Sequence, residues 1–305
     1  MSGVVLSTRE VALLMNVTET TIKRWADENA IVCARTFGGH RKFQLRDVIE
    51  FAERHHYPLV GLAPRSVEDQ DREMLDFALQ TRNFGKLSAF FLKQALVADR
   101  NAMYELLSYI AKHHISLPAI GDEIIKPAMV RIGEMWKEGN LEVYQEHGAS
   151  QSILDALIRL APDLHRKTSN GLSALCACVE GNHHEIGLKI LSYALEAEGW
   201  SVRYLGADTP FETIRAFMKA AAPQLVCLSA ASHRIGKEHF EEFRKTGKCA
   251  ATIDAACIVG GPVAAHARAE ELFCDALTGS IHDAISFVKE RFQLKPGPRK
   301  KQHTR

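Results

Sequence analysis

The stretch that decides the fold of the larger part of this chain is Leu172–Val179 (LSALCACV), followed at once by Glu180–Gly187 (EGNHHEIG). The first run is continuously apolar and of strand length, and the second brings glycines and polar residues before a helical pattern begins. Further β-rich runs alternate with helical stretches of about 10–15 residues, and these runs are Val202–Leu205, Leu225–Leu228, Cys257–Val259 and Ala276–Leu277. This alternation predicts a parallel α/β sheet.

The segment Glu180–Gly187 is the first candidate site. It follows the first predicted strand, and ligands of open α/β sheets bind at the carboxyl ends of the strands. Its glycines allow a close approach to the backbone, and a neutral imidazole of His183 or His184 is a good donor to a soft or borderline metal. The alternative is that both histidines belong to a solvated loop. The segment lacks a Gly-x-Gly-x-x-Gly pattern, which disfavours a dinucleotide site.

A helical segment precedes the sheet. From Arg72 to about His165, apolar residues recur at spacings of three and four, which predicts helices throughout. Within it, the motif Trp136-x9-Glu146-His147 spans the end of one predicted helix and the start of the next. An aromatic plane beside a Glu-His pair could line a pocket for a flat or bulky ligand. The alternative is that Trp136 belongs to a helical core and that the pair is solvated.

The N-terminal residues predict a helix-turn-helix. Ser7-x-x-Glu10 is a capping box that starts a helix at Thr8, and Thr18 can cap a second helix that runs to about Asn29. The second helix would bury Ile22 and Trp25 and turn hydroxyl and basic side chains outward. Such side chains reach phosphates and base edges in a major groove, and here they are Thr20, Thr21, Lys23 and Arg24.

A hairpin with a basic tip follows this second helix. The run Ile31–Phe43 contains two β-compatible segments around Gly38-Gly39, a pair that permits a tight turn. Its cations would form a wing that holds phosphates or enters a minor groove, and they are Arg35, His40, Arg41 and Lys42. A closing helix is predicted over Asp47–Glu53. The alternative is a small helical adaptor with incidental surface charge.

Composition limits the function classes. The 305 residues carry 38 Lys and Arg against 37 Asp and Glu, so any nucleic-acid binding must come from a local patch. No apolar run reaches the roughly 18 residues of a membrane span, Met1–Leu6 lacks the features of a signal peptide, and the seven scattered cysteines suit reduced, buried thiols. We therefore expect a cytoplasmic protein that does not engage a membrane.

Changes in residue composition and in hydrophobic periodicity predict five segments. These are a DNA-binding domain over 1–57, a linker over 58–72, a helical domain over 73–166, an α/β domain over 170–293 and a basic tail over 294–305 that we expect to be disordered.

The N-terminal segment resembles the DNA-binding domain of the MerR superfamily. The resemblance rests on Ser7–Ala12 and on Gly38–Phe43. The long dimerising coiled coil of many members is missing, so any dimerisation must come from elsewhere in the chain.

The two candidate constellations together resemble the cobalamin-binding unit shared by methionine synthase, corrinoid proteins and cobalamin-dependent regulators. There, the motif Asp/Glu-x-His-x-x-Gly supplies the lower axial ligand of cobalt. The resemblance implies that His184 is this ligand and that the helical segment caps the upper face of the corrin. It also implies cofactor contacts around the displaced tail and the lower face, at Asn182, His183, Gly187, Ser229, Gly260 and Gly261.

The order of the domains resembles the CarH/LitR family of adenosylcobalamin-dependent photoreceptor repressors. The implied fold is multi-domain: a winged helix-turn-helix, a four-helix-bundle cap and a flavodoxin-like α/β sheet of Rossmann-like type. The resemblance places Trp136 beside the adenosyl group, Val143 and Glu146 in contact with it, and His147 near the upper face.

The implied function is regulatory, not enzymatic. The family resemblance implies binding of double-stranded operator DNA as a homo-oligomer, a dimer or a tetramer, that holds adenosylcobalamin in the dark and comes off the DNA in light. Methylcobalamin is a possible replacement for the adenosyl form.

Two departures from the family pattern keep alternatives open. Asn182 occupies the usual acidic position; an amide can hold the imidazole ring but donates less electron density to it. Ser229 is followed by Ala230-Ala231 instead of the usual Leu or Thr. One alternative is a corrinoid carrier in methyl transfer. The other is a regulator without cobalamin that senses redox state through its cysteines or haem through its histidines.

Overall fold

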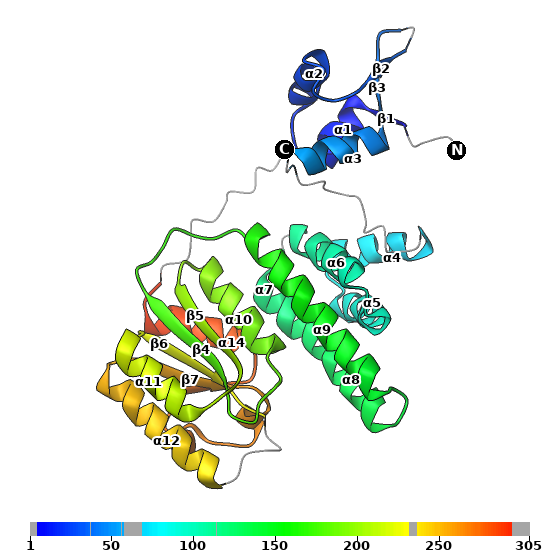
Figure 1. The fold of residues 1–305 in the computed structure, drawn as a ribbon. Coiled ribbons are helices and arrows are strands. Elements are labelled where there is room, and N and C mark those ends of the chain that lie inside the picture. Colours follow the sequence, from blue (N-terminus) through cyan, green and yellow to red (C-terminus); the bar gives the residue numbers. More distant parts are fainter. Residues whose placement is uncertain are drawn as a thin grey trace. The chain divides into compact units, whose positions relative to one another are not determined.

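The computed structural model describes residues 5–36, 38–55, 57, 69–113, 115–231 and 237–294. They divide into two compact units, Met1–Arg72 and Glu73–Arg305 (Figure 1). Most of the predicted linker, residues 58–68, and the predicted tail from residue 295 onward lie outside the described residues.

The first unit combines three helices with a small antiparallel sheet of order β1-β3-β2. Its elements are β1 (Val5–Ser7), α1 (Thr8–Leu14), α2 (Glu19–Asp27), β2 (Ala34–Arg35), β3 (Arg41–Gln44) and α3 (Leu45–Arg54). One apolar cluster holds it together and includes Ile22, Trp25, Phe43 and Phe51. The burial of these large side chains supplies most of the free energy that stabilises so small a unit.

The predicted local signals of this unit are largely confirmed. The capping box forms, since Ser7 N–H donates to Glu10 Oε2 at 2.6 Å and Glu10 N–H to Ser7 Oγ at 3.3 Å. The hairpin turns around Gly39, whose φ is +80°. Helix α2 ends at Asp27, two residues before the predicted end. Strand β1 was not predicted, because three residues carry too little pattern and are defined by their pairing with β3.

The second unit begins with helices that pack against one another, chiefly α5, α6, α8 and α9. Their bounds, with the shorter elements between them, are α4 (Asp69–Gln80), α5 (Phe84–Val97), α6 (Arg100–Lys112), α7 (Leu117–Ala119), the π-helix η1 (Ile120–Ile125), α8 (Lys126–Lys137), α9 (Val143–Leu160) and the 3-10 helix η2 (Ala161–Asp163). The turn between α8 and α9 uses Gly139 at φ +73°.

The second unit continues with a five-stranded parallel sheet of order β5-β4-β6-β7-β8. All five predicted runs are strands: β4 (Ser173–Val179), β5 (Ser201–Thr209), β6 (Leu225–Ser229), β7 (Ala256–Gly260) and β8 (Ala276–Thr278). The order reverses at β4, and ligands of doubly wound sheets bind at such a switch point.

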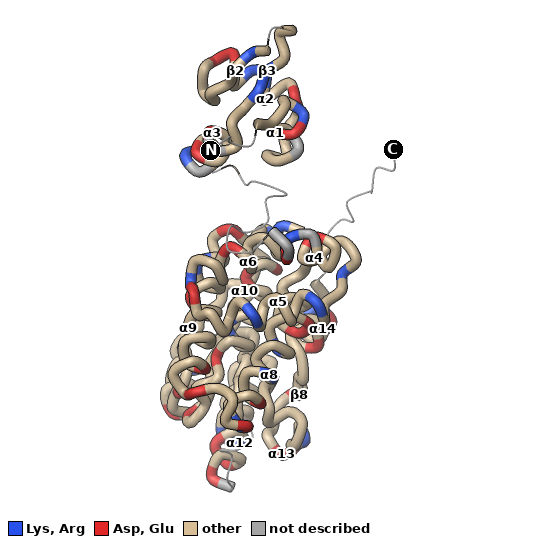
Figure 2. The backbone as a smooth tube through the Cα atoms, turned by 90° about the vertical axis from the view of Figure 1, so that its right-hand side faces the viewer, with Lys and Arg blue, Asp and Glu red and all other residues tan. Residues whose placement is uncertain are grey.

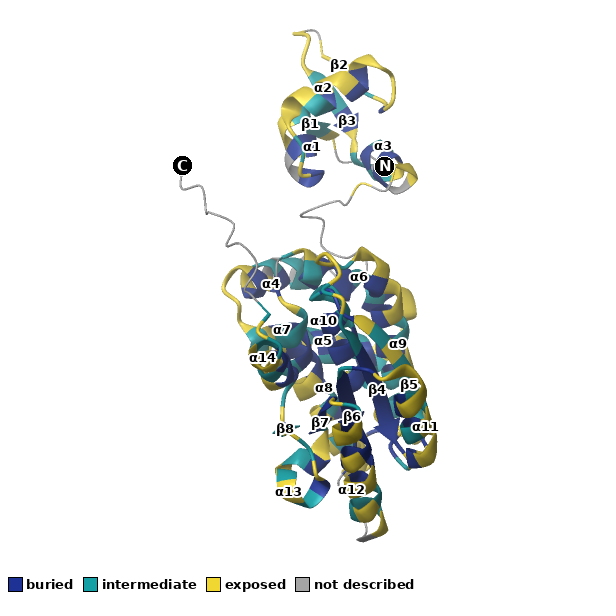
Figure 3. Cartoon of the chain, turned by 90° about the vertical axis from the view of Figure 1, so that its left-hand side faces the viewer, coloured by how far each residue is buried: buried dark blue, intermediate teal, exposed yellow. Residues whose placement is uncertain are grey.

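Helices cover both faces of this sheet (Figure 1). They are α10 (Ile186–Ala197), α11 (Phe211–Ala221), α12 (Lys237–Thr252), the 3-10 helix η4 (Pro262–Ala265), α13 (Ala269–Leu272) and α14 (Ile281–Arg291). Helices α11 and α12 pack against one another, as do α10 and α14. The inner strands β4, β6 and β7 are therefore mostly buried, whereas the edge strand β5 is partly exposed and the helices expose their outer sides (Figure 3).

A polar joint connects the helical part of this unit to the end of the sheet. Asp122, in the π-helix, accepts hydrogen bonds from Ile281 N–H at 2.9 Å and from His282 N–H at 2.8 Å, so it caps α14. Lys126 Nζ donates to the carbonyl oxygen of Gly279 at 2.9 Å. A Cβ on Gly121 would lie 2.4 Å from Ile281 Cδ1, so a larger residue at this position would require the Ile281 side chain to move.

All seven cysteines are free thiols, five of them buried, as the sequence predicted. No helix in the described part of the chain combines the length and the apolarity that a bilayer crossing requires.

Candidate functional site

The loop between β4 and α10 lies at the carboxyl end of the first strand and exposes both predicted histidines, His183 and His184. Gly181 has a φ of +79°, and its N–H donates to Asp208 Oδ1 at 2.7 Å. Asp208 N–H in turn donates to the carbonyl oxygen of Asn182 at 3.0 Å. The loop is therefore held to the end of β5 by two hydrogen bonds, while its imidazoles face solvent.

Asn182 is buried beneath this loop, with 2% of its surface exposed. Its Nδ2 donates to the carbonyl oxygen of Ser229 at 3.0 Å and to Ser229 Oγ at 3.2 Å. Its Oδ1 accepts the backbone N–H of His184 at 3.1 Å. The amide thus ties the loop to the end of β6 and fixes the backbone that carries His184.

The paired glycines after β7 complete this cluster. Gly261 has a φ of +89°, and a Cβ there would lie 2.6 Å from the carbonyl oxygen of Ala230 and 3.1 Å from Ser229 Oγ. Gly260 precedes it as the last residue of β7. By contrast, a Cβ on Gly187 would meet nothing within 4 Å. The structure therefore brings Asn182, Ser229 and Gly261 together and leaves open space at Gly187.

The second set of predicted residues lies where α8 ends and α9 begins. Trp136 and Val143 are exposed at 48% and 51%, so Trp136 is not a core residue of the helices. Glu146 Oε1 accepts a hydrogen bond from Ser150 Oγ at 2.8 Å, and its Oε2 lies 3.5 Å from His147 Nε2. An aromatic ring, an aliphatic side chain and a Glu-His pair are thus presented on the surface.

A cavity of about 350 Å³ lies between the helical part and the start of α10. Its lining consists of Arg100, Gln151, Leu154, Asp155, Ile158, Glu185 and Lys189. This cavity was not predicted from the sequence. A signal was available, because Gln151, Asp155 and Ile158 continue along α9 at the spacings of three and four that begin with Val143 and His147.

Charged and aromatic groups meet at one wall of this cavity. Tyr204 O–H donates to Glu185 Oε2 at 2.7 Å, and Lys189 Nζ lies 3.8 Å from the centre of the Tyr204 ring. Burial, and then the Glu185 carboxylate, raise the pKa of Tyr204, so the phenol stays protonated at neutral pH. The residue next to His184 is therefore an anchored carboxylate.

Three cysteines of the sheet domain, of which only Cys178 lies near this site, are poor nucleophiles. Burial raises the pKa of Cys178 to about 12 and that of Cys274 to about 11, and it also raises the pKa of Cys257. Because the thiolate is the reactive form, these side chains are inert thiols at neutral pH.

The predicted DNA-contacting residues lie on α2 and on the β2–β3 hairpin (Figure 2). Thr20, Lys23 and Arg24 are exposed on α2; Thr21 is half-buried, and its N–H donates to Oγ1 of the capping Thr18. On the hairpin, His40 is exposed and Lys42 is half-buried. Arg35 and Arg41 both contact Asp27; the Arg35 side chain is nevertheless 59% exposed, whereas that of Arg41 is 17% exposed.

Three family models match parts of the chain. Residues 5–56 match a helix-turn-helix domain family, and residues 92–160 and 172–285 each match a B12 binding domain family.

Two curated relatives are transcriptional repressors of Myxococcus xanthus. The chain is 39% identical to the repressor CarA over 98 residues, which is 32% of this chain and 34% of CarA. It is 32% identical to the repressor CarH over 158 residues, which is 51% of this chain and 50% of CarH. The matched stretches thus span only a third to a half of these relatives.

A solved structure shares the fold of the second unit. The monomethylamine corrinoid protein of Methanosarcina barkeri superimposes with a TM-score of 0.55 at 17% identity, over 68% of this chain and 99% of the other. The chain thus carries a helix-turn-helix domain match followed by two B12 binding domain matches, and parts of it are similar to the CarA and CarH repressors.

Proposed function

We propose that this protein is a light-responsive transcriptional repressor that uses adenosylcobalamin to control its assembly on operator DNA. The observation that carries the proposal is the presence, in one chain, of a helix-turn-helix unit and a B12-binding unit with an exposed imidazole, His184, at the carboxyl end of β4.

The residues at this end of the sheet fit a cobalamin. His184 offers one imidazole, which suits a metal that brings its other ligands in a macrocycle. Gly187 leaves space for a close approach, and Gly261 keeps the backbone near Ser229 free of a side chain. We assign His184 as the residue that would ligate the cobalt, while Asn182, His183, Gly187, Ser229, Gly260 and Gly261 would contact the corrin and its tail.

The helical part supplies the other side of the proposed site as a cap. Trp136 and Val143 offer apolar surface beside which an adenosyl group can pack, while Glu146 and His147 offer polar contacts. Adenosylcobalamin, when bound, supplies a cobalt–carbon bond that visible light breaks. The chain's own contribution is to hold α8 and α9 in one position while Trp136 has a partner and in another when it has none.

Assembly connects this site to DNA. A second DNA-binding unit on the same oligomer raises avidity by about 10²–10⁴ without any new contact. Cofactor and DNA are coupled only if the dark and illuminated states differ in assembly, and the coupling is then reciprocal. We propose a dimer or tetramer in the dark that dissociates in light, with the β2–β3 hairpin acting as the wing on DNA.

The test uses the full chain with adenosylcobalamin, methylcobalamin or no cofactor, in the dark and after illumination. Gel filtration measures assembly, and the visible spectrum measures binding. We expect a larger species only with adenosylcobalamin in the dark, and its loss in light. A chain that stays colourless in excess cobalamin, or that elutes identically under all conditions, would contradict the proposal.

A second candidate is a corrinoid carrier in methyl transfer. It is favoured by the shared fold of the second unit with a corrinoid protein. A carrier has no use for a helix-turn-helix unit, so binding of duplex DNA by the purified chain distinguishes the two functions. A redox sensor is less well supported, because burial keeps Cys178, Cys257 and Cys274 protonated.

A further inference from the structure

Two arginines face each other across the hairpin of the first unit. Arg35 of β2 and Arg41 of β3 are direct partners in the antiparallel ladder. Like charges placed directly opposite in a sheet are destabilising, and strand β2 is only two residues long, so it has few hydrogen bonds with which to offset the repulsion. The hairpin therefore needs a counter-charge.

Asp27, the last residue of α2, supplies that charge. Its Oδ1 accepts from Arg35 Nη2 at 3.0 Å and from Arg41 Nη2 at 2.5 Å. Arg41 is 17% exposed although it is a cation, which shows how closely it is held. The hydrogen bond from Arg41 is the largest cause that lowers the pKa of Asp27.

The place of Asp27 in its helix supports this role. A carboxylate at a helix C-terminus faces the negative end of the macrodipole and weakens the helix. Neither helix propensity nor capping accounts for an aspartate there, whereas the two guanidinium groups do. The contact spans two elements, since it joins the helix predicted to enter the major groove to the hairpin predicted to contact the backbone.

We propose that Asp27 is a positioning residue that sets the angle between the recognition helix and the hairpin, and that Arg35 and Arg41 serve this joint in place of direct DNA contacts. The proposal rests on the proposed DNA-binding function. It predicts that Asp27→Asn, although it adds net positive charge, lowers sequence-specific binding, because the hairpin loses its fixed position. Non-specific binding should instead rise with the added charge.

The test compares Asp27→Asn with Glu50→Gln in the full chain. Glu50 is an exposed carboxylate of α3 that pairs with Arg54, so its replacement makes the same change of charge away from the hairpin. The probes are a duplex selected from a random pool by the wild-type chain and a duplex of random sequence. Fluorescence anisotropy gives both affinities over a series of KCl concentrations.

We expect Glu50→Gln to leave the ratio of specific to non-specific affinity unchanged and Asp27→Asn to lower it about tenfold, as one mismatched base pair would. Equal behaviour of the two variants would overturn the proposal.

A second measurement needs no DNA and separates the failure of this proposal from the failure of the DNA-binding function. Backbone hydrogen exchange over the β2–β3 hairpin should be faster in Asp27→Asn than in the wild type. Adding Arg35→Gln to that variant should slow the exchange again, because it removes the repulsion between Arg35 and Arg41. Unchanged exchange in Asp27→Asn would refute the joint even if the chain binds DNA. If no duplex is bound but exchange responds as expected, the joint stands and the DNA-binding function fails.

Discussion

Asn182 shows how one atom changes the chemistry of the proposed cobalt site. A carboxylate at this position could accept hydrogen bonds but could not donate the two that Ser229 receives here. The amide therefore fixes the ends of β4 and β6 relative to each other, and its oxygen accepts the backbone N–H of His184. In the proposed site, Asn182 would thus position the backbone that carries His184.

His184 is the residue on which cobalamin retention should depend. We expect His184→Ala to weaken retention at least tenfold, because loss of a metal ligand costs at least as much as the roughly 10–100-fold measured for outer partners. The control is His165→Ala, which removes an exposed imidazole that is not assigned to the site. Equilibrium dialysis and the visible spectrum measure the effect, and equal loss in both variants would contradict the assignment.

Alanine substitutions at Gly261 and Gly187 should distinguish effects on folding stability from effects on cobalamin binding. Gly261→Ala places a methyl group 2.6 Å from a carbonyl oxygen at positive φ, so we expect a loss of about 1–3 kcal/mol in the free energy of unfolding. Gly187→Ala meets open space within a helix and should raise stability by up to about 1 kcal/mol while it weakens cobalamin binding. Denaturant unfolding and dialysis together test both. A destabilised Gly187→Ala would show that the space is not free.

At the scale of elements, Asp122 caps a helix from another part of the same unit. Asp122→Ala should reduce the free energy of unfolding by about 0.5–2 kcal/mol and speed the exchange of the Ile281 and His282 amides. Ser280→Ala is the control, because Ser280 caps the same helix from within the sheet domain. If only Ser280→Ala altered the exchange of these two amides, the hydrogen bonds from Asp122 to the start of α14 would not contribute to stability.

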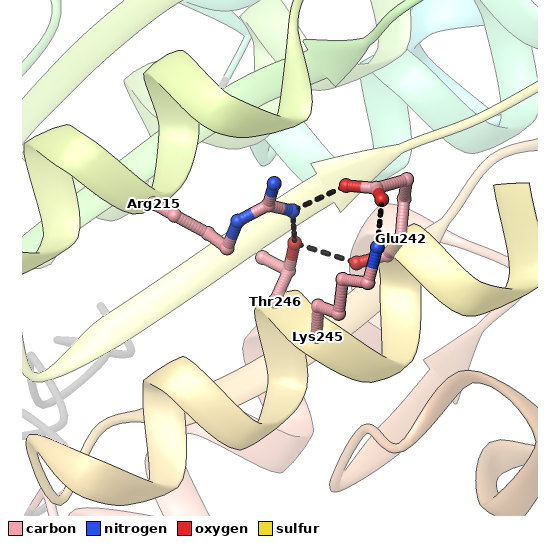
Figure 4. Close-up of polar contacts among 4 residues, drawn as sticks. All are labelled: Arg215, Glu242, Lys245 and Thr246. Carbon is pink, nitrogen blue, oxygen red and sulfur yellow. Dashed lines mark hydrogen bonds and ion pairs between the residues drawn. The ribbon is translucent and has the colours of Figure 1, made fainter.

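Helices α11 and α12 are joined by a charged cluster that should make stability depend on pH (Figure 4). Glu242 accepts from Lys245 Nζ at 2.7 Å and from Arg215 Nη1 at 2.6 Å, and these two hydrogen bonds lower its pKa. A carboxylate whose folded pKa is depressed stabilises the fold above its unfolded pKa of about 4.3 and loses that contribution as pH falls through the folded value.

We therefore expect Glu242→Gln to be less stable than wild type at pH 7 and to lose less stability between about pH 5 and pH 3. Glu241→Gln changes the same charge at an exposed neighbouring position and is the control. Thermal unfolding over a pH series measures both variants. Parallel pH curves for Glu242→Gln and wild type would show that the cluster contributes nothing.

At the scale of the whole molecule, Trp136 should decide whether assembly responds to the adenosyl group. We expect Trp136→Ala to bind cobalamin but to elute as the same species with adenosylcobalamin and with methylcobalamin in the dark. Tyr144→Ala is the control, because Tyr144 is 73% exposed on the adjoining helix and is not assigned to the site. Dark gel filtration tests this. A Trp136→Ala chain that still assembles only with the adenosyl form would remove Trp136 from the mechanism.

Local sequence patterns predicted much of the fold. The apolar run before Glu180 predicted β4, the capping box predicted the start of α1, and the Gly-Gly pair predicted the hairpin, because each is encoded by neighbours in the chain. Contacts between distant residues were not predictable. Asp122 lies 159 residues from Ile281, and Asn182 lies 47 from Ser229, so no periodicity connects them. The cavity likewise depends on how α9 meets α10.

The hydrogen bonds of Asp122 and Lys126 hold the N-terminal end of α8, so a tilt of this helix would move its C-terminal end most. Lys126, at the start of α8, is held to Gly279, while Trp136 lies ten residues further along the same helix, or about 15 Å away at the rise of an α-helix. A rotation of about 10° around the anchored end would carry the indole through about 2–3 Å. A small tilt of α8 about Lys126 would therefore move the Trp136 ring out of contact with a bound group. The helix would stay intact, and the hydrogen bond of Lys126 to Gly279 would be kept.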